Sequence, residues 1–496
     1  MSRFGAQVGR SIAWSGAGSM VLRFGQLLAG ILVARLLTPH DFGAFAVTLA
    51  VYVIVVNISE LGVGSALIRQ RDGLDATAPT AVTFSLVSSA VLAGGMWLVA
   101  PMTAELLGAA EATGAIRVMA LVVLLAGPSA VPAALLTREF RQDRRFAADL
   151  TNFLVSTGVL ILLAVNGGGV LALAWSRVAG QLVSVVLLLV LSPVRYRPGF
   201  RRVEAVRLFR FGVPLVGANL VGYSLGNVDV VTLGRVSGAG TLGSYTLANN
   251  VAGWPLGLFS SVLTSVGLPV LSQVRGDVRV LTRYLANAMS TVCAVFFLIT
   301  AMCAGLAQNL VDALYGPQWH AAGPVLAVLA LYGSVRVVLA LLSDALVACN
   351  SPRSLFGIQV TWLVVLVPVM IVAVHLRDAV GAATAQVVVS ALVVVPLTLL
   401  ALRRVAGVPV RPLLGAAVRP LLAAVPAGLV AHLSARALDS AWGGLLVGGV
   451  VGTLVYLALL GRWSLRLVTE IRAVYGDAPV AEAEVPPGLV AAQRTD

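Results

Sequence analysis

The sequence predicts an all-α polytopic membrane protein with about 14 transmembrane helices, in two pseudo-symmetric six-helix lobes around a central cavity, plus two C-terminal helices. Three observations support this prediction: the composition, the length of the apolar stretches and the placement of the arginines. Of 496 residues, 59% are hydrophobic and only 11% are charged, and the mean hydropathy is +0.95. Because soluble globular proteins have about 25% charged residues, this composition excludes an ordinary soluble enzyme and a disordered chain.

The apolar stretches have the length that a membrane helix needs, about 20 residues, and they lack the alternation of membrane β-strands. The connections between them are short, so no soluble domain is inserted. The predicted spans are 11–35, 42–66, 79–100, 116–136, 146–165, 168–191, 210–234, 243–272, 284–305, 322–349, 355–375, 379–402, 413–433 and 441–461.

The arginines indicate how the chain is oriented in the membrane. All 34 basic residues are arginine, and the net charge is +13. With the N-terminus inside, 26 of them fall in inner segments, five at outer ends and three within spans. This bias follows the positive-inside rule, and it explains the basic charge better than nucleic-acid binding does. We therefore expect a multi-pass protein of the bacterial cytoplasmic membrane, with no cleavable signal peptide and both termini in the cytoplasm.

A weak internal repeat appears at a shift of 200 residues. Ile31–Arg35 aligns with Val231–Arg235, and Gly43–Phe45 aligns with Gly243–Tyr245. The matched segments lie at the same membrane side, which predicts a parallel repeat of the kind found between transporter halves. We expect an N-terminal six-helix lobe at 1–200, a C-terminal six-helix lobe at 201–405, helices 13 and 14 at 406–462, and a cytoplasmic tail at 463–496.

Several motifs resemble those of the Wzx-like oligosaccharide flippases of the MOP superfamily, and together they cover about residues 10–405. These motifs are Arg35–Phe45, Glu60–Asp72, Thr137–Phe146, Asn227–Arg235 with Leu242–Tyr245, and Tyr315–Trp319. The resemblance implies two lobes in a V around a cavity. It also implies that a polyprenyl-diphosphate-linked glycan moves from the inner to the outer leaflet by alternating access. The implied partners are membrane lipids and this glycan substrate, and the implied state is a monomer.

Three arginines fall within predicted spans: Arg23, Arg177 and Arg336. A charge at mid-bilayer costs at least about 2.5–3.5 kcal/mol, so such a residue faces a partner or a wet cavity. Arginine stays charged and can bind a phosphate through two parallel hydrogen bonds. Each is a candidate substrate contact, and the alternative is a structural ion pair, for Arg336 with Asp344. The resemblance further implies that Arg23 matches a cavity-lining arginine of the lipid II flippases.

Polar residues of the predicted second lobe are further candidates. Asp229 is the only acid deep in span seven, beside Asn227. It is a candidate group for H⁺ or Na⁺ coupling, and the alternative is a hydrogen bond that holds the lobe together. Asn227 and Asn249 are uncharged candidates for contacting the substrate in the cavity, with helix packing as the alternative.

Gating candidates lie at the ends of the spans. Arg35 and Arg235 occupy matching outer ends of the two lobes, where they could form an outer gate or snorkel to the headgroups. Glu60 lies near the inner end of span two, as a gating salt bridge or a surface pair. Trp319 is expected to be an interfacial anchor.

Two other function classes fit the sequence less well than a flippase does. An ion-coupled drug or cation antiporter of the same superfamily would favour a cavity dominated by acids, whereas the buried set here is mainly arginine. A membrane glycosyltransferase or polymerase would need a large outer loop, and the longest predicted one is only about 305–321. The three cysteines and four histidines show no metal-ligand or disulfide pattern. We therefore expect a transporter without a cofactor, and not an enzyme.

Overall fold

The computed structural model describes residues 3–60, 63–69, 73–274 and 277–476. Every regular element within them is helical, which confirms the predicted all-α fold. Ten helical stretches among these residues are long and apolar enough to cross a membrane. The elements are α1 (Arg3–Leu36), α2 (Pro39–Glu60), α3 (Val63–Arg69), α4 (Leu74–Leu106), α5 (Ala112–Arg138), α6 (Gln142–Val165), α7 (Gly169–Leu191), α8 (Arg202–Leu225), α9 (Val228–Val274), α10 (Val278–Gly305), α11 (Ala307–Leu314), η1 (Pro317–Trp319), α12 (Ala322–Ala348), α13 (Pro352–Val389), η2 (Ser390–Val394), α14 (Val395–Ala406), α15 (Val410–Arg436) and α16 (Ala441–Gly476).

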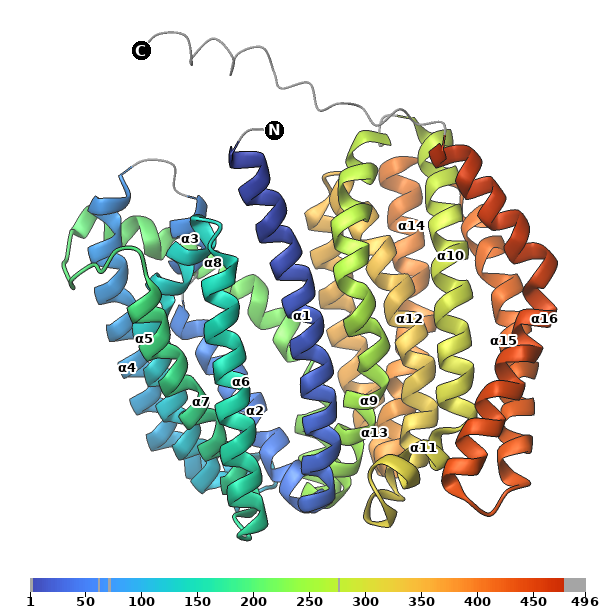
Figure 1. Ribbon diagram of the computed structural model, residues 1–496, viewed down its shortest axis with the longest axis horizontal. Coiled ribbons are helices and arrows are strands. Elements are labelled where there is room, and N and C mark those ends of the chain that lie inside the picture. Colours follow the sequence, from blue (N-terminus) through green and yellow to red (C-terminus); the bar gives the residue numbers. More distant parts are fainter. Residues whose placement is uncertain (1–2, 61–62, 70–72, 275–276, 477–496) are drawn as a thin grey trace.

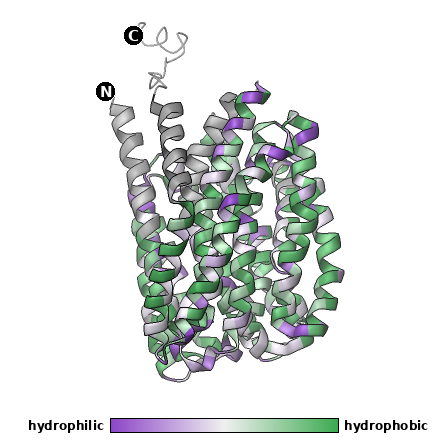
Figure 2. Cartoon of the chain, turned by 90° about the vertical axis from the view of Figure 1, so that its right-hand side faces the viewer, coloured by the Kyte–Doolittle hydropathy of each residue, from purple (hydrophilic) through white to green (hydrophobic). Residues whose placement is uncertain are grey.

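The helices form two groups with α1 between them (Figure 1). Helices α2 to α7 lie on one side, and α9 to α16 lie on the other. The described chain begins and ends at the same end of the molecule, as the even number of predicted spans requires. Hydrophobic residues dominate the helices (Figure 2). Many large apolar side chains, such as Leu98 and Leu162, are exposed. This surface suits contact with lipid.

The predicted seventh span, 210–234, is wrong in its extent. Helix α8 ends at Leu225, and the backbone turns at Gly226 and Asn227 before α9 begins. The Asn227 side chain donates to the Tyr223 carbonyl oxygen at 2.8 Å and so satisfies the end of α8. A second interruption follows at Gly238, whose φ of 78° suits glycine. Hydropathy averaged over about 19 residues reads through such breaks, because a few small or polar residues change the average little.

Helix α13 and the segments after it contain two of the predicted spans. The backbone is non-helical at Arg377 and Asp378. A Cβ atom on Gly381 would overlap the carbonyl oxygen of Ala373, eight residues earlier. A continuous helix would separate those positions by about 12 Å along its axis. The chain therefore reverses between the predicted spans 355–375 and 379–402.

The connector between α7 and α8 lies against α4. The Thr83 hydroxyl donates to the Gly199 carbonyl oxygen at 2.7 Å, and the Arg201 amide donates to Thr80 Oγ1 at 3.1 Å. Tyr196 donates to Asp75 at 2.6 Å, and burial together with this bond raises the pKa of Tyr196 to about 12. Helix α8 then packs against α3, α4 and α13, so it runs from the first helix group to the second. The predicted lobe boundary at residue 200 lies just before α8, the helix that crosses between the two groups. The division into lobes stays a prediction.

Helices α15 and α16 cover the outside of α10, away from α1 (Figure 1). The Tyr456 hydroxyl donates to the Ala294 carbonyl oxygen at 2.7 Å and fixes α16 on α10. Small residues, including Ala301 and Ala427, let α10 and α15 approach closely. Helix α16 continues to Gly476, past the predicted end of the last span, and the rest of the predicted tail lies outside the described residues.

Candidate functional site

A central cavity with two chambers lies beside α1. The first chamber, of about 650 Å³, is bounded by α1, α9 and α12. The second, of about 790 Å³, is bounded by α1, α2, α6 and α7, with two residues of α9. Both are lined by Gln26, Gly30, Phe42 and Asn250. The chambers are therefore neighbouring parts of one cavity.

The first chamber brings together three of the predicted site residues. Arg23 comes from α1, Arg336 from α12 and Asn249 from α9. Arg23 makes no ion pair within the described residues. No aspartate or glutamate lines this chamber in the described part of the chain. Two arginines without a lining acid make the chamber suitable for an anion.

Asp229 lies next to this chamber but does not line it. The carboxylate is 5% exposed and accepts hydrogen bonds from the Tyr245 hydroxyl at 2.7 Å and the Val230 amide at 2.9 Å. Arg336 interacts with it electrostatically and lies over the Tyr332 ring, 5.6 Å from the centroid. The alternative pair of Arg336 with Asp344 is absent from the described residues.

Replacing Tyr245 by phenylalanine is expected to destabilise the fold. The change removes a donor from a buried carboxylate, which costs about 1–3 kcal/mol. Thermal unfolding in detergent should show a lower midpoint for Tyr245→Phe. Tyr223→Phe is the matched control, because its hydroxyl bonds to the half-buried Asn57 at 2.8 Å and should matter less. An unchanged midpoint in Tyr245→Phe would show that the hydrogen bond from Tyr245 to Asp229 does not stabilise the fold.

The second chamber contains the predicted Arg177 and residues that the sequence analysis missed. Arg177 is exposed to the chamber and lies near the Tyr52 hydroxyl. Asp149 lines the same chamber, with its carboxylate 4.0 Å from Arg145 Nε. The missed lining residues are Gln26, Asn152, Ser156, Thr157, Ser176 and Thr246. Those on α6 recur at helical spacing, which is the signal that could have found them.

The end of α1 is fixed to the segment of α11 and η1. Arg35 donates from Nε to the Leu314 carbonyl oxygen and from Nη2 to that of Ala313, each at 2.7 Å. In return, Trp319 Nε1 donates to the Ala34 carbonyl oxygen at 2.7 Å. Trp319 is fully buried, so its prediction as an interfacial anchor is wrong. The apolar ring is used for packing between the helix groups, and it meets the edge of Phe42.

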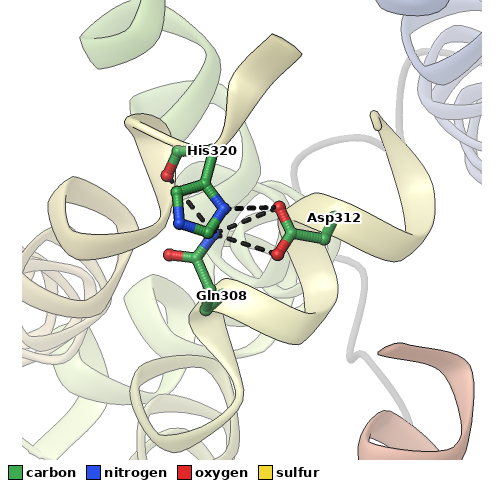
Figure 3. A network of polar contacts seen from close by, with 3 residues as sticks. All are labelled: Gln308, Asp312 and His320. Carbon is green, nitrogen blue, oxygen red and sulfur yellow. Dashed lines mark hydrogen bonds and ion pairs between the residues drawn. The ribbon is translucent and has the colours of Figure 1, made fainter. Parts of the chain in front are cut away.

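A polar network stiffens the same segment (Figure 3). Gln308 Nε2 donates to both carboxylate oxygens of Asp312 at 3.1 Å. His320 Nδ1 lies 3.2 Å from Asp312 Oδ1 and 2.8 Å from Gln308 Nε2. The network joins α11 to the residue after η1, and so holds the acceptors of Arg35 and the Trp319 ring in one unit.

Glycines bring the two helix groups into backbone contact at this end. A Cβ atom on Gly43 in α2 would overlap the Ala239 carbonyl oxygen in α9. A Cβ atom on Gly243 would overlap the Pro39 carbonyl oxygen. The two contacts are equivalent, because Gly243 and Ala239 lie 200 residues after Gly43 and Pro39. Such equivalence is expected where two repeats are related by a pseudo-two-fold axis.

Two further predicted residues, Arg235 and Asn227, line neither chamber. Arg235 is exposed and has no side-chain hydrogen bond within the described residues. Asn227 caps α8 and lines neither chamber. The side chain of Glu60 lies outside the described residues.

Comparison with known proteins identifies relatives across most of the chain. The succinoglycan biosynthesis transport protein ExoT of Rhizobium meliloti is 30% identical over 337 residues, which cover 65% of this chain and 66% of ExoT. The lipopolysaccharide biosynthesis protein WzxC of Escherichia coli is 21% identical over 374 residues, covering 74% of this chain and 75% of WzxC. The chain thus spans about two thirds of the length of ExoT.

Solved structures share the fold. The lipid II flippase MurJ in an inward closed conformation superposes with a TM-score of 0.75 at 14% identity, over 92% of this chain and all of MurJ. An inward-facing multidrug resistance MATE transporter of the MOP superfamily gives 0.59 at 17% identity, over 78% of this chain and 99% of the transporter. The apolar helices and bacterial relatives make this a multi-pass bacterial membrane protein. The polysaccharide biosynthesis protein family matches residues 32–324, more than half of the sequence, and the chain belongs to that family.

Proposed function

We propose that this protein flips a polyprenyl-diphosphate-linked oligosaccharide from the inner to the outer leaflet of the bacterial cytoplasmic membrane, for polysaccharide export. The observation that carries the proposal is the first chamber, where Arg23 and Arg336 face one space without a lining acid among the described residues. A diphosphate is the part of such a lipid that costs most to move across hydrocarbon, and guanidinium groups bind phosphate well. The names of ExoT and MurJ, a transport protein and a flippase, support the same function.

The cavity would open alternately to the two sides of the membrane. In this proposal the outer side is closed by the Arg35 contacts and by the glycine contacts of α2 with α9. Arg235, at the matching position of the second repeat, would contact the substrate or headgroups when that side opens. Both termini would be cytoplasmic, and the protein would act as a monomer without a catalytic role.

Energy for transport would come from coupling to H⁺ or Na⁺. Asp229 is the best-placed group for this, because it is a buried carboxylate near enough to the cavity arginine Arg336 to interact with it electrostatically. Glu60 is the second coupling or gating candidate. Binding of a cation by Asp229 would weaken its attraction for Arg336 and strengthen the hold of Arg336 on phosphate.

Ion-coupled export of a drug or cation is the alternative. The fold shared with the MATE transporter and the Asp149 carboxylate in the second chamber favour it. The two arginines of the first chamber oppose it, since they would repel a cation.

Native mass spectrometry of the purified protein with its co-purified lipids tests the proposal. We expect a polyprenyl-diphosphate glycan on the wild type, lost in Arg23→Ala. Arg117→Ala is the matched control and should keep the lipid, because Arg117 stacks on Trp97 and lines neither chamber. Finding only bulk phospholipid on the wild type, together with ion-driven drug efflux, would favour the antiporter.

A further inference from the structure

We propose that the two chambers divide the substrate, so that the first holds the diphosphate and the second selects the glycan. This inference rests on the proposed flippase function and deepens it. It assigns sugar recognition to α6 and α1, and above all to Asn152 and Gln26.

Charge separates the roles of the chambers. Arg23 and Arg336 line the first chamber, and no described acid lines it. The second chamber is lined by Arg177 and also by the Asp149 carboxylate, so its lining charges cancel. A diphosphate is attracted more strongly to the first chamber, and in the second it would meet a carboxylate.

Uncharged polar groups outnumber the charged ones in the lining of the second chamber, and such groups suit the recognition of sugar hydroxyls. The amides of Asn152 and Gln26 have no hydrogen-bond partner within the described residues, and each offers donors and an acceptor. The Ser156 and Ser176 hydroxyls donate to carbonyl oxygens of their own helices, at 3.0 and 2.8 Å, and keep lone pairs free to accept. Sugar hydroxyls both donate and accept, so they can satisfy all of these groups.

The polar groups form a stripe on one face of α6. Asp149, Asn152 and Ser156 follow at spacings of three and four residues, with the Phe153 ring beside them. Gly180 of α7 packs under this stripe, where a Cβ atom would lie 2.7 Å from Asn152 Oδ1. Close packing on α7 limits where the Asn152 amide can turn, so it is presented to the chamber in a restricted orientation.

The two chambers share lining residues, so one ligand can extend through both. Gly30 lines both chambers and has no side chain, and a Cβ atom there would meet nothing within 4 Å. Gln26 lies one turn earlier on α1 and also lines both. A diphosphate at Arg23 could therefore carry its first sugars past Gly30 to Asn152.

Affinities for two lipids test this division: undecaprenyl diphosphate, and the same lipid bearing a short neutral oligosaccharide. In Asn152→Ala, the affinity for the glycan-bearing lipid should fall about tenfold, as expected for a lost sugar hydrogen bond. The affinity of the same variant for the sugar-free lipid should stay within about twofold of the wild-type value. Arg23→Ala should weaken both lipids to a similar degree. Asn166→Ala, at the residue that follows α6, is the matched control, because the Asn166 side chain bonds to the Leu162 carbonyl oxygen and lines neither chamber.

The outcomes separate the two proposals. If Asn152→Ala weakens both lipids equally, or neither, the division of the substrate is wrong while the flippase function stands. If the wild type binds neither lipid, the proposed function itself fails. Restored affinity in Asn152→Gln would support hydrogen bonding over mere packing.

Discussion

Replacing Arg23 and Arg336 together by glutamine is expected to reduce flipping of the lipid-linked glycan by at least about a hundredfold. Glutamine keeps much of the length and one donor group but removes the charge. A hydrogen bond to a charged group contributes about 1.5–3 kcal/mol, and each arginine can make two such bonds to phosphate. Each single variant should lose about tenfold or more by the same reasoning.

The measurement is translocation of a fluorescent polyprenyl-diphosphate oligosaccharide in proteoliposomes. The control is Arg117→Gln with Arg353→Gln, which removes the same charge at positions that line neither chamber. Flipping by the cavity variant at the rate of this control would show that the first chamber is not the phosphate site. Arg336→Gln should also perturb Asp229, its electrostatic neighbour, so the thermal midpoint of each variant has to be measured alongside.

The fold was predictable because membrane helices depend mainly on length, hydropathy and arginine placement. The repeat at a shift of 200 residues was also visible, and Gly43 with Gly243 proved to mark the contact between helix groups. The breaks at Gly226–Asn227 and Gly238 were missed, because hydropathy averaged over a whole span changes little where a few small or polar residues interrupt the helix. The burial of Trp319 was missed for the same kind of reason, since composition does not reveal which apolar ring meets another lobe.

The candidate site could be predicted in its charges but not in its uncharged groups. Arg23, Arg177 and Arg336 stand out because a charge in a span is costly and therefore rare. Asn152 and Ser156 do not stand out, because such residues also hold membrane helices together. Only the folded chain distinguishes a polar side chain that faces a chamber from one that bonds to the backbone. Asn227 is an example of the second kind, because it caps α8.

Replacing Gly43 or Gly243 by alanine is expected to hinder closure of the outer side and to lower flipping about five- to a hundredfold. Each new Cβ atom would overlap a backbone carbonyl oxygen on the facing helix, so α2 and α9 must separate. Overpacking of this kind costs about 1–3 kcal/mol, which is enough to shift a two-state equilibrium about five- to a hundredfold. A membrane-impermeant thiol reagent applied outside should label Asn250→Cys more strongly in either variant, in a background without the three native cysteines.

The pseudo-symmetry of the two contacts adds a requirement beyond the loss of flipping, which is that both glycine variants have the same effect. Gly43 faces Ala239 and Gly243 faces Pro39, so the two alanine variants disturb equivalent contacts on either side of one pseudo-two-fold axis. They should therefore increase outside labelling to a similar extent. Gly94→Ala should leave labelling unchanged, because a Cβ atom at Gly94 meets nothing within 4 Å. A strong effect of Gly43→Ala without one of Gly243→Ala would mean that a local contact, and not a symmetric outer gate, holds the two lobes together at this end.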